Sequence, residues 1–540
     1  MYIDTVPNRN SPPAILLRES QREGKVIRKR TIANLSHWEP ARIEALRRAL
    51  RGEFDHLAAG DPICGPVFGL LFVLKAIADE LGISRALGSA RWAKLALFLV
   101  LARVADQGSR LSAVRWAVDQ AVEDVLALAA FDEDDLYEAM DEVEQRHQRI
   151  EKSLYQAYLR RRGGGAPTLV LYDVTSTYLE GTQNEMGEFG YNRDGKKGKL
   201  QIVVGLLTDE QGEPLAVRVF KGNTADPDTV AAQIEVVKEQ FGVKEVVFVG
   251  DRGMVKSLGK EALKGAGLRY ITALTDPQIR KLLKAGTLQM ALFDEKVCEV
   301  EAGGLRYVLR KNPEVERKEL HRVEDKLAKL AARLEARNRF VAQSKRSSPE
   351  SGQRNLQEWV RRHKLQSFVK VSLRERMLVV EIDEAAKSDA LLLAGCYVIE
   401  TDLPRPAMQA QDVHDRYKDL ALVERDFRTM KTGFLEIRPV FVRKGNRTQA
   451  HALISMLALK IVREMEKRLS ARFGTTDTDP HAITLPDALA ALSRLCLQIY
   501  PPEDGLTVTR LPRPDQRQQK ILEALRITIP QISANVARQS

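Results

Sequence analysis

Two short apolar segments, each ending in an aspartate, constrain the fold of this chain most. Residues 168–177 are Thr-Leu-Val-Leu-Tyr-Asp-Val-Thr-Ser-Thr, and residues 245–251 are Glu-Val-Val-Phe-Val-Gly-Asp. Short apolar runs of this kind predict strands buried in a sheet. A carboxylate where such a strand ends lies at the carboxyl edge of the sheet, where α/β proteins place their ligand-binding and catalytic residues. We therefore expect Asp173 and Asp251 to lie side by side on neighbouring strands.

The order of the predicted elements between these segments indicates a mixed sheet. Strands are expected at 168–172, 200–207, 214–220, 245–250 and 269–273, with helices at about 227–241 and near residue 260. A hairpin-like turn, Thr208-Asp-Glu-Gln-Gly-Glu, makes the second and third strands antiparallel. This order resembles a ribonuclease-H-like sheet, an α/β fold with carboxylates on its first and fourth strands.

Changes in composition divide the chain into regions. The flexible, basic run Arg160-Arg-Arg-Gly-Gly-Gly separates a mainly helical N-terminal region from the sheet. From Val315 to about Val341, apolar residues at alternating spacings of three and four predict a coiled-coil seam, followed by strand-like runs. We expect an inserted helical-hairpin and β-strand unit there. The predicted regions are 1–160, 166–275 (first part of the core), 276–400 (insertion), 401–470 (second part of the core) and 471–540 (C-terminal helical segment).

Charge and composition narrow the class of protein. Lys and Arg number 84 against 73 Asp and Glu, a net charge of +11, which favours a polyanionic partner. A predicted basic strand near the N-terminus carries Lys25, Arg28, Lys29 and Arg30. It is either a phosphate-contacting ribbon or a solvated strand face.

Other sequence features argue against membrane and disulfide classes. The uncharged apolar run 95–102 is far shorter than the ~18 residues of a membrane span, and the N-terminus has no secretory signal pattern. The four cysteines form no C-x-x-C pair, so a disulfide framework or zinc ribbon is not expected. We expect a cytoplasmic protein with no membrane partner.

A third carboxylate lies on a predicted helix after the insertion. Leu420, Val423, Phe427 and Met430 form an apolar stripe at helical spacing. Glu424, Arg428 and Lys431, at i, i+4 and i+7, share another face of this helix. That face is either a solvated ion-pair surface or a carboxylate and two phosphate-binding cations aimed at the acidic edge of the sheet.

The second interpretation has a chemical reason. Phosphodiester hydrolysis benefits from two hard cations, one on the attacking and one on the leaving oxygen. Magnesium prefers oxygen ligands and keeps several waters, so two or three carboxylates are sufficient. Asp173, Asp251 and Glu424 would supply them, while Arg428 and Lys431 would hold DNA phosphates.

The residues around Glu424 resemble those of the DDE transposases of bacterial insertion sequences, in the branch with a Y-x2-R-x3-E-x6-K signature. Tyr417, Glu424 and Lys431 stand at the required offsets, whereas the arginine position is Leu420, which puts a phosphate contact there in doubt. Further matching phrases are Tyr172-Asp-Val-Thr-Ser-Thr-Tyr, Gly190-Tyr-Asn-Arg-Asp-Gly, Phe220-Lys-Gly-Asn-Thr, Gly250-Asp-Arg-Gly-Met and Ile437-Arg-Pro-Val-Phe. Members of that branch carry a β-rich insertion before the glutamate.

The resemblance implies an enzyme that cleaves DNA at transposon ends and joins the freed 3′-hydroxyl to target DNA. It implies two Mg²⁺ ions, for which Mn²⁺ would substitute, held by Asp173, Asp251 and Glu424. The implied partners are double-stranded DNA, as terminal inverted repeats and target, and a second copy of the chain. The implied DNA contacts are Tyr417, Arg428 and Lys431, with Arg252, Arg193 and Lys196 as further candidates.

Two other functions remain open from the sequence. A phosphatase of the haloacid-dehalogenase type also uses a D-x-T-x-T phrase, as in Asp173-Val-Thr-Ser-Thr177, with the aspartate as nucleophile. It needs a lysine and a further acid soon after Asp251, and only Lys256 is present. An inactive, DNA-binding transposase relative is the non-enzymatic alternative. His451, in an apolar helix, is expected to be a packed histidine.

Overall fold

The computed structural model divides into two compact units that are described separately. The first contains residues 1–80, 110–133 and 461–540, and the second contains residues 81–109 and 134–460. The structure describes residues 1–8, 12–23, 26–52, 62–252, 254–255, 257–344, 347–431, 435–439, 441–475, 479, 481–500, 508–530 and 533–535. In these ranges, no helix combines the length and the apolar character that crossing a membrane requires.

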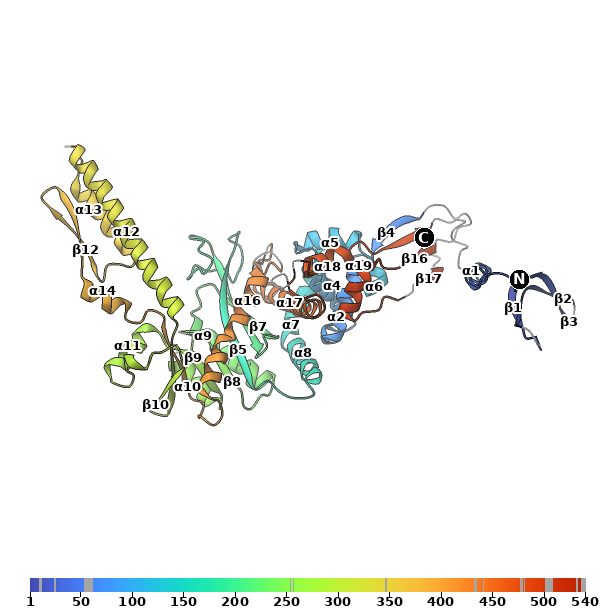
Figure 1. Ribbon diagram of the computed structural model, residues 1–540, viewed down its shortest axis with the longest axis horizontal. Coiled ribbons are helices and arrows are strands. Elements are labelled where there is room, and N and C mark those ends of the chain that lie inside the picture. Colours follow the sequence, from blue (N-terminus) through green and yellow to red (C-terminus); the bar gives the residue numbers. More distant parts are fainter. Residues whose placement is uncertain are drawn as a thin grey trace. The chain divides into compact units, whose positions relative to one another are not determined.

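A mixed sheet forms the centre of the second unit, in the order β10-β11-β14-β9-β8-β5-β6-β7 (Figure 1). Its strands are β5 (Leu169–Tyr178), β6 (Gln201–Asp209), β7 (Pro214–Lys221), β8 (Val247–Gly250), β9 (Arg269–Ala273), β10 (Cys298–Ala302), β11 (Leu305–Lys311) and β14 (Cys396–Thr401). β8 runs parallel to β5 and β9, and the other pairs are antiparallel. The expected α/β class, with antiparallel first strands, is confirmed.

Helices α8, α10, α15 and α16 contact strands of this sheet. The helices of this unit are α3 (Ile83–Leu87), α4 (Arg91–Ala105), α7 (Glu133–Gln145), α8 (His147–Arg161), α9 (Asp226–Glu235), α10 (Ser257–Gly265), α11 (Asp276–Lys284), α15 (Ala410–Lys418), α16 (Leu420–Lys431) and the first part of α17 (Gly445–Phe473). Tyr155 and Tyr158 of α8 belong to the core formed by the central strands, and the Tyr155 ring stacks on Phe241 with centroids 4.2 Å apart. All nine residues of β6 are buried, as expected for a strand covered on both faces.

The prediction that the first strand ends at Asp173 is wrong. β5 continues to Tyr178 because residues 174–177 are buried and stay paired with β6, where Asp173 faces Leu206. The parallel neighbour β8 ends there instead: its last residue, Gly250, is in register with Tyr172.

The segment expected as a separate insertion divides between two structures. β10, β11 and β14 extend the large sheet beyond β9. Between β11 and β14 an arm projects, made of α12 (Pro313–Gln343), α13 (Pro349–Arg362), the hairpin β12 (Val369–Arg374) and β13 (Met377–Ile382), and α14 (Glu384–Leu391) (Figure 1). The predicted seam of α12 packs into a core of its own with Leu356, Val360 and Leu378.

The first unit contains two smaller sheets. β1 (Tyr2–Val6), β2 (Ala14–Glu23) and β3 (Val26–Asn34) form an antiparallel sheet, which includes the predicted N-terminal ribbon. β4 (Ile63–Val67), β15 (Cys496–Tyr500), β16 (Val508–Arg510) and β17 (Ser533–Asn535) form the second. The helices of this unit are α1 (Pro40–Leu50), α2 (Gly69–Glu80), α5 (Arg110–Val118), α6 (Val122–Leu126), α18 (Leu485–Leu492), α19 (Gln516–Leu525) and the second part of α17.

Candidate active site

Strand register brings Asp173 and Asp251 together. Tyr172 of β5 pairs with Gly250, the last residue of β8. Asp173 and Asp251 are the residues that directly follow this pair. Asp173 is the one partly exposed residue in the otherwise buried run 169–177. The two carboxylates therefore stand at the point where the parallel pairing stops and the chain after β8 leaves the sheet.

Helix α16 supplies the third carboxylate. Leu420, Val423, Phe427 and Met430 are all buried, which confirms the predicted stripe. Since this stripe packs against β5, Glu424 on the neighbouring face reaches the pocket beside the sheet. Leu420, at the arginine position of the signature, belongs to the buried stripe.

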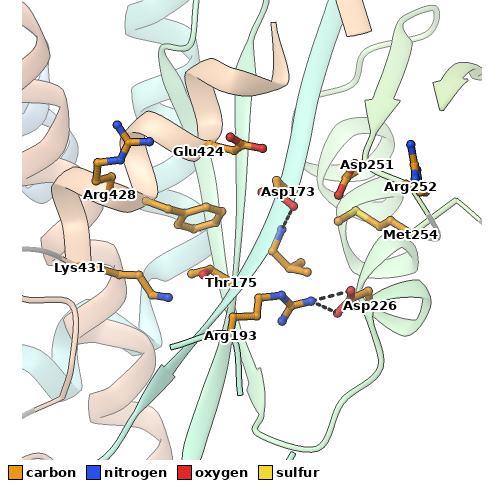
Figure 2. A pocket seen from close by; sticks show the side chains of 12 residues that line it. Asp173, Thr175, Arg193, Asp226, Asp251, Arg252, Met254, Glu424, Arg428 and Lys431 are labelled. Atoms are coloured by element: carbon orange, nitrogen blue, oxygen red, sulfur yellow. Dashed lines mark hydrogen bonds and ion pairs between the residues drawn. The ribbon is translucent and has the colours of Figure 1, made fainter. Parts of the chain in front are cut away.

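One pocket of ≈ 420 Å³ collects the three carboxylates (Figure 2). Figure 2 shows Asp173 between Glu424 and Asp251 across this pocket. Its lining residues are Asp173, Val174, Thr175, Arg193, Asp226, Asp251, Arg252, Met254, Glu424, Phe427, Arg428 and Lys431. Asp173 and Glu424, which are 251 residues apart in the sequence, thus line the same pocket.

The carboxylates interact electrostatically. The pKa of Asp173 is raised to about 7, by burial first and then by the negative charges of Asp251 and Glu424, while a hydrogen bond from the Val174 backbone and the charge of Arg193 act to lower it. The Val174 N–H donates to Asp173 Oδ1 at 2.8 Å. A buried carboxyl among like charges resists ionisation unless a cation is near it.

Tyr417 contacts the site through Asp251. Its hydroxyl donates to Asp251 Oδ1 at 3.0 Å from the end of α15. Burial, and then the charge of Asp251, raise the pKa of Tyr417, so this hydroxyl stays protonated and keeps donating. Tyr417 therefore orients one carboxylate of the pocket.

Carboxylates outside the triad hold three of the cations that line the pocket. Lys431 Nζ lies 2.6 Å from Asp194 Oδ1, and both side chains are mostly buried. Arg193 binds both carboxylate oxygens of Asp226 at 2.6 Å (Figure 2).

The third pair is looser. Arg252 lies 3.5 Å from Asp276, with both side chains exposed. Neither Asp194 nor Asp226 was expected from the sequence. The available signals were the position of Asp194 next to Arg193 and of Asp226 just before Pro227 at a helix start.

The donor set fits magnesium in its chemistry. All three carboxylates offer hard oxygen ligands, and Mg²⁺ is usually bound through one or two carboxylates, with waters and substrate phosphates completing the shell. Among the described residues, no three His, Cys, Asp or Glu side chains are close enough to hold one ion together. A site of this kind would therefore rely on oxygens from water and substrate.

Several predicted residues lie away from this pocket lining. The Lys196 ammonium lies 5.9 Å from the Tyr178 ring centroid. Arg28, Lys29 and Arg30 are exposed on β3 of the other unit. His451 is buried on α17, with 2% of its surface exposed. Lys25 and Lys256 lie outside the described residues.

Comparison with known families identifies the class. Residues 164–461, more than half of the chain, match the family described as "Transposase DDE domain". The chain belongs to this family of transposases. Residues 3–62 match the "IS1634 family transposase, N-terminal domain". Together these matches confirm the predicted class, an insertion-sequence DDE transposase.

Solved structures show only distant likeness. A piggyBac transposase synaptic complex with hairpin DNA has 9% identity and a TM-score of 0.35, over 68% of this chain and 63% of that chain. A Mos1 transposase paired-end complex with left transposon end has 9% identity and a TM-score of 0.15, over 34% of this chain and 58% of that chain. The chain thus spans less than two thirds of either chain. No curated protein matches it.

Proposed function

We propose that this protein cleaves DNA at the ends of its insertion sequence and transfers the freed 3′-hydroxyl strand into target DNA. The observation that carries the proposal is the pocket shared by Asp173 of β5, Asp251 just after β8, and Glu424 of α16. The strand order β7-β6-β5-β8-β9 supports a ribonuclease-H-like core, with Asp173 on its first strand and Asp251 directly after its fourth.

Asp173, Asp251 and Glu424 would hold two Mg²⁺ ions, and Mn²⁺ would substitute. When bound, divalent cations activate the attacking oxygen and neutralise charge on the leaving oxygen. The chain's own contribution is to hold the three carboxylates apart on rigid elements, with Tyr417 fixing Asp251 by its hydrogen bond. The raised pKa of Asp173 supports this role, since a cation would relieve its repulsion from the other two carboxylates.

Cations around the pocket would bind the DNA backbone. Arg428 and Lys431 share the α16 face with Glu424, and Arg193 and Arg252 line the same pocket. Phosphate contacts of this kind fix the position of DNA and carry no sequence information. The basic strand β3 would add contacts to double-stranded DNA, both terminal repeats and target. A homodimer, acting in the cytoplasm, would bring two ends together.

The phosphatase alternative has less support. It assigns Asp173 as a nucleophile and leaves Glu424 without a role, although Glu424 lines the same pocket. An inactive DNA-binding relative would have no need for three carboxylates next to bound phosphates.

The experiment is strand-mapped cleavage of a plasmid that carries this gene with its native flanks. We expect the purified protein with Mg²⁺ to cut at a pair of flanking inverted repeats, and Asp173→Asn to abolish cutting. Breaks that persist in Asp173→Asn would refute the proposal. So would an absence of breaks combined with Asp173-dependent hydrolysis of small phosphate esters.

Glu424→Gln separates chemistry from binding. It removes one carboxylate and no phosphate contact, so cleavage should be lost while affinity for the repeat DNA stays nearly unchanged. A variant that loses binding and still cleaves at a normal rate when DNA is saturating would contradict the assigned role of Glu424.

A further inference from the structure

The loop between β5 and β6 presents two large aromatic rings to solvent. Phe189 is 67% exposed and Tyr191 is 82% exposed. Single exposed apolar side chains are common and need no explanation. Two rings on either side of Gly190, in a loop that continues to the pocket-lining Arg193, raise the question of what they contact.

The backbone that carries these rings is firmly held. Glu188 and Gln201 exchange two backbone hydrogen bonds, of 3.1 and 3.0 Å. The buried Gln201 side chain donates from Nε2 to the carbonyl oxygens of Tyr191, at 3.2 Å, and Gly222, at 2.7 Å. A Cβ at Gly190 would lie 2.1 Å from the Gly222 oxygen, so the loop rests directly on the end of β7. The backbone that carries the two exposed rings is therefore held in place by these hydrogen bonds.

Cationic side chains follow the rings along the chain. The Arg193 guanidinium lies 5.8 Å from the Tyr191 ring centroid and also lines the carboxylate pocket. Lys196 and Lys197 come next, between Gly195 and Gly198, which both have positive φ, and Lys199 follows Gly198. Aromatic rings beside a cationic track are the combination with which proteins bind unpaired nucleotides, because each ring stacks on a base and the cations neutralise phosphates.

The exposed rings of Phe189 and Tyr191 are suited to unpaired bases and not to bases within a duplex. Bases inside a duplex are already stacked on their neighbours, so a side-chain ring can take only a base that is unpaired or extruded. The cations favour a nucleic acid strand over a protein partner at these rings.

We propose that Phe189 and Tyr191 form a stacking site for unpaired nucleobases of the DNA strand that enters the carboxylate pocket. The inference rests on the proposed function, because it assumes that DNA reaches Asp173, Asp251 and Glu424. It adds a substrate feature: DNA next to the cleavage position is unpaired when bound, and Arg193 connects the stacked bases to the pocket.

The test measures stacking directly, with the full-length protein in EDTA so that no strand is cut. The probe is a single strand of roughly 12 nucleotides containing 2-aminopurine, whose fluorescence falls when the base stacks on an aromatic ring. The double variant Phe189→Leu, Tyr191→Leu should bind the single strand roughly 10- to 100-fold more weakly and lose the quenching. Blunt duplex DNA should bind as it does to the wild type.

Two controls isolate the rings. Tyr191→Phe keeps a ring and should retain quenching and affinity. Phe340→Leu removes a ring that is 51% exposed on α12, in the arm of the same unit, and it should change neither. Quenching and single-strand affinity that survive in the double variant would overturn the proposal. A double variant that loses self-association in ultracentrifugation and keeps normal DNA binding would also overturn it, since the rings would then contact a second copy.

The outcome is separable from that of the proposed function. Magnesium-dependent cleavage by the wild type, together with unchanged quenching in the double variant, refutes the stacking site alone. Ring-dependent quenching without any cleavage at the repeats upholds the stacking site and refutes the proposed function.

Discussion

At the scale of single residues, the carboxyl group of Asp173 is buried next to two other carboxylates, Asp251 and Glu424. Its pKa of about 7 arises from burial first and then from Asp251 and Glu424. An ordinary aspartate in the unfolded chain ionises near pH 3.8. Between these values the folded protein keeps a proton that the unfolded chain releases. The contribution of Asp173 to stability therefore falls as pH rises from about 4 to 7, and stays low above 7.

Asp173→Asn tests this balance. Without divalent cations at pH 8, the variant should be more stable to unfolding than the wild type, by on the order of 2–4 kcal/mol, with little difference near pH 4. Mg²⁺ should stabilise the wild type and leave the variant nearly unchanged. Denaturation at both pH values, in EDTA and in Mg²⁺, measures these differences. A variant less stable than the wild type at pH 8 would show that Asp173 has a favourable partner already.

The Lys431 ammonium forms an ion pair with Asp194. A DNA phosphate must therefore displace the Asp194 carboxylate or bind the ammonium alongside it. Lys431→Ala should weaken binding to duplex DNA and reduce the dependence of log affinity on log salt by about one. Asp194→Asn should do the opposite, with a few-fold gain in affinity for duplex of any sequence, because it releases the ammonium. Titrations at several salt concentrations distinguish the two. An unchanged salt slope in Lys431→Ala would argue against a phosphate contact.

That Asp173, Asp251 and Glu424 lie near one another could be predicted from local patterns, namely two apolar strand segments and one helical stripe, although β5 does not end at Asp173. The partners of Lys431 and Arg193 could not. Asp194 and Asp226 meet these cations through the path of a loop and the start of a helix, which are set by long-range contacts.

At the scale of elements, the spacing of apolar residues correctly predicted helices that bury only one face. The α16 stripe and the α12 seam are examples. Prediction failed at the ends of elements. β5 continues past Asp173 because β6 pairs with it.

The short helix α15 influences the site through Tyr417. Tyr417→Phe removes the hydrogen bond to Asp251, and loss of a donor that orients a metal ligand typically costs 10–100-fold in metal affinity. We expect the Mg²⁺ concentration for half-maximal cleavage to rise roughly 10-fold, with DNA binding in EDTA little changed.

Tyr270→Phe is the matched control, because it removes a similar hydrogen bond, of 2.6 Å to Glu400, among residues that do not line the pocket. An equal effect of both substitutions on the magnesium dependence would assign Tyr417 a purely structural role.

At the scale of the whole molecule, the arm of α12 and α13 interrupts the sheet in the sequence without interrupting it in space. Lys311 pairs with Cys396, and the Asn312 N–H donates to the Gly395 carbonyl at 2.8 Å. The strands β11 and β14 thus approach each other as in a hairpin. Sequence periodicity located the coiled coil, but the return of β14 to the same sheet depends on pairing across many residues.

Deletion of residues 313–394 should therefore leave the sheet folded. It joins Asn312 to Gly395, and Asn-Gly is a favoured two-residue hairpin turn. The loss of Leu393 from its core should lower stability by about 2–5 kcal/mol. Circular dichroism and thermal unfolding measure the outcome. A chain that fails to form a cooperative structure would show that the arm is needed to assemble the sheet.

The most direct measurement maps where a divalent cation binds on the folded protein. Fe²⁺ replaces Mg²⁺, and ascorbate with peroxide generates radicals that cut the backbone next to the bound ion. If Asp173, Asp251 and Glu424 form one metal site, cuts should appear near all three residues, compete with Mg²⁺, and disappear together in Asp173→Asn. Cuts near only one of the three, or cuts that persist in that variant, would contradict a shared site.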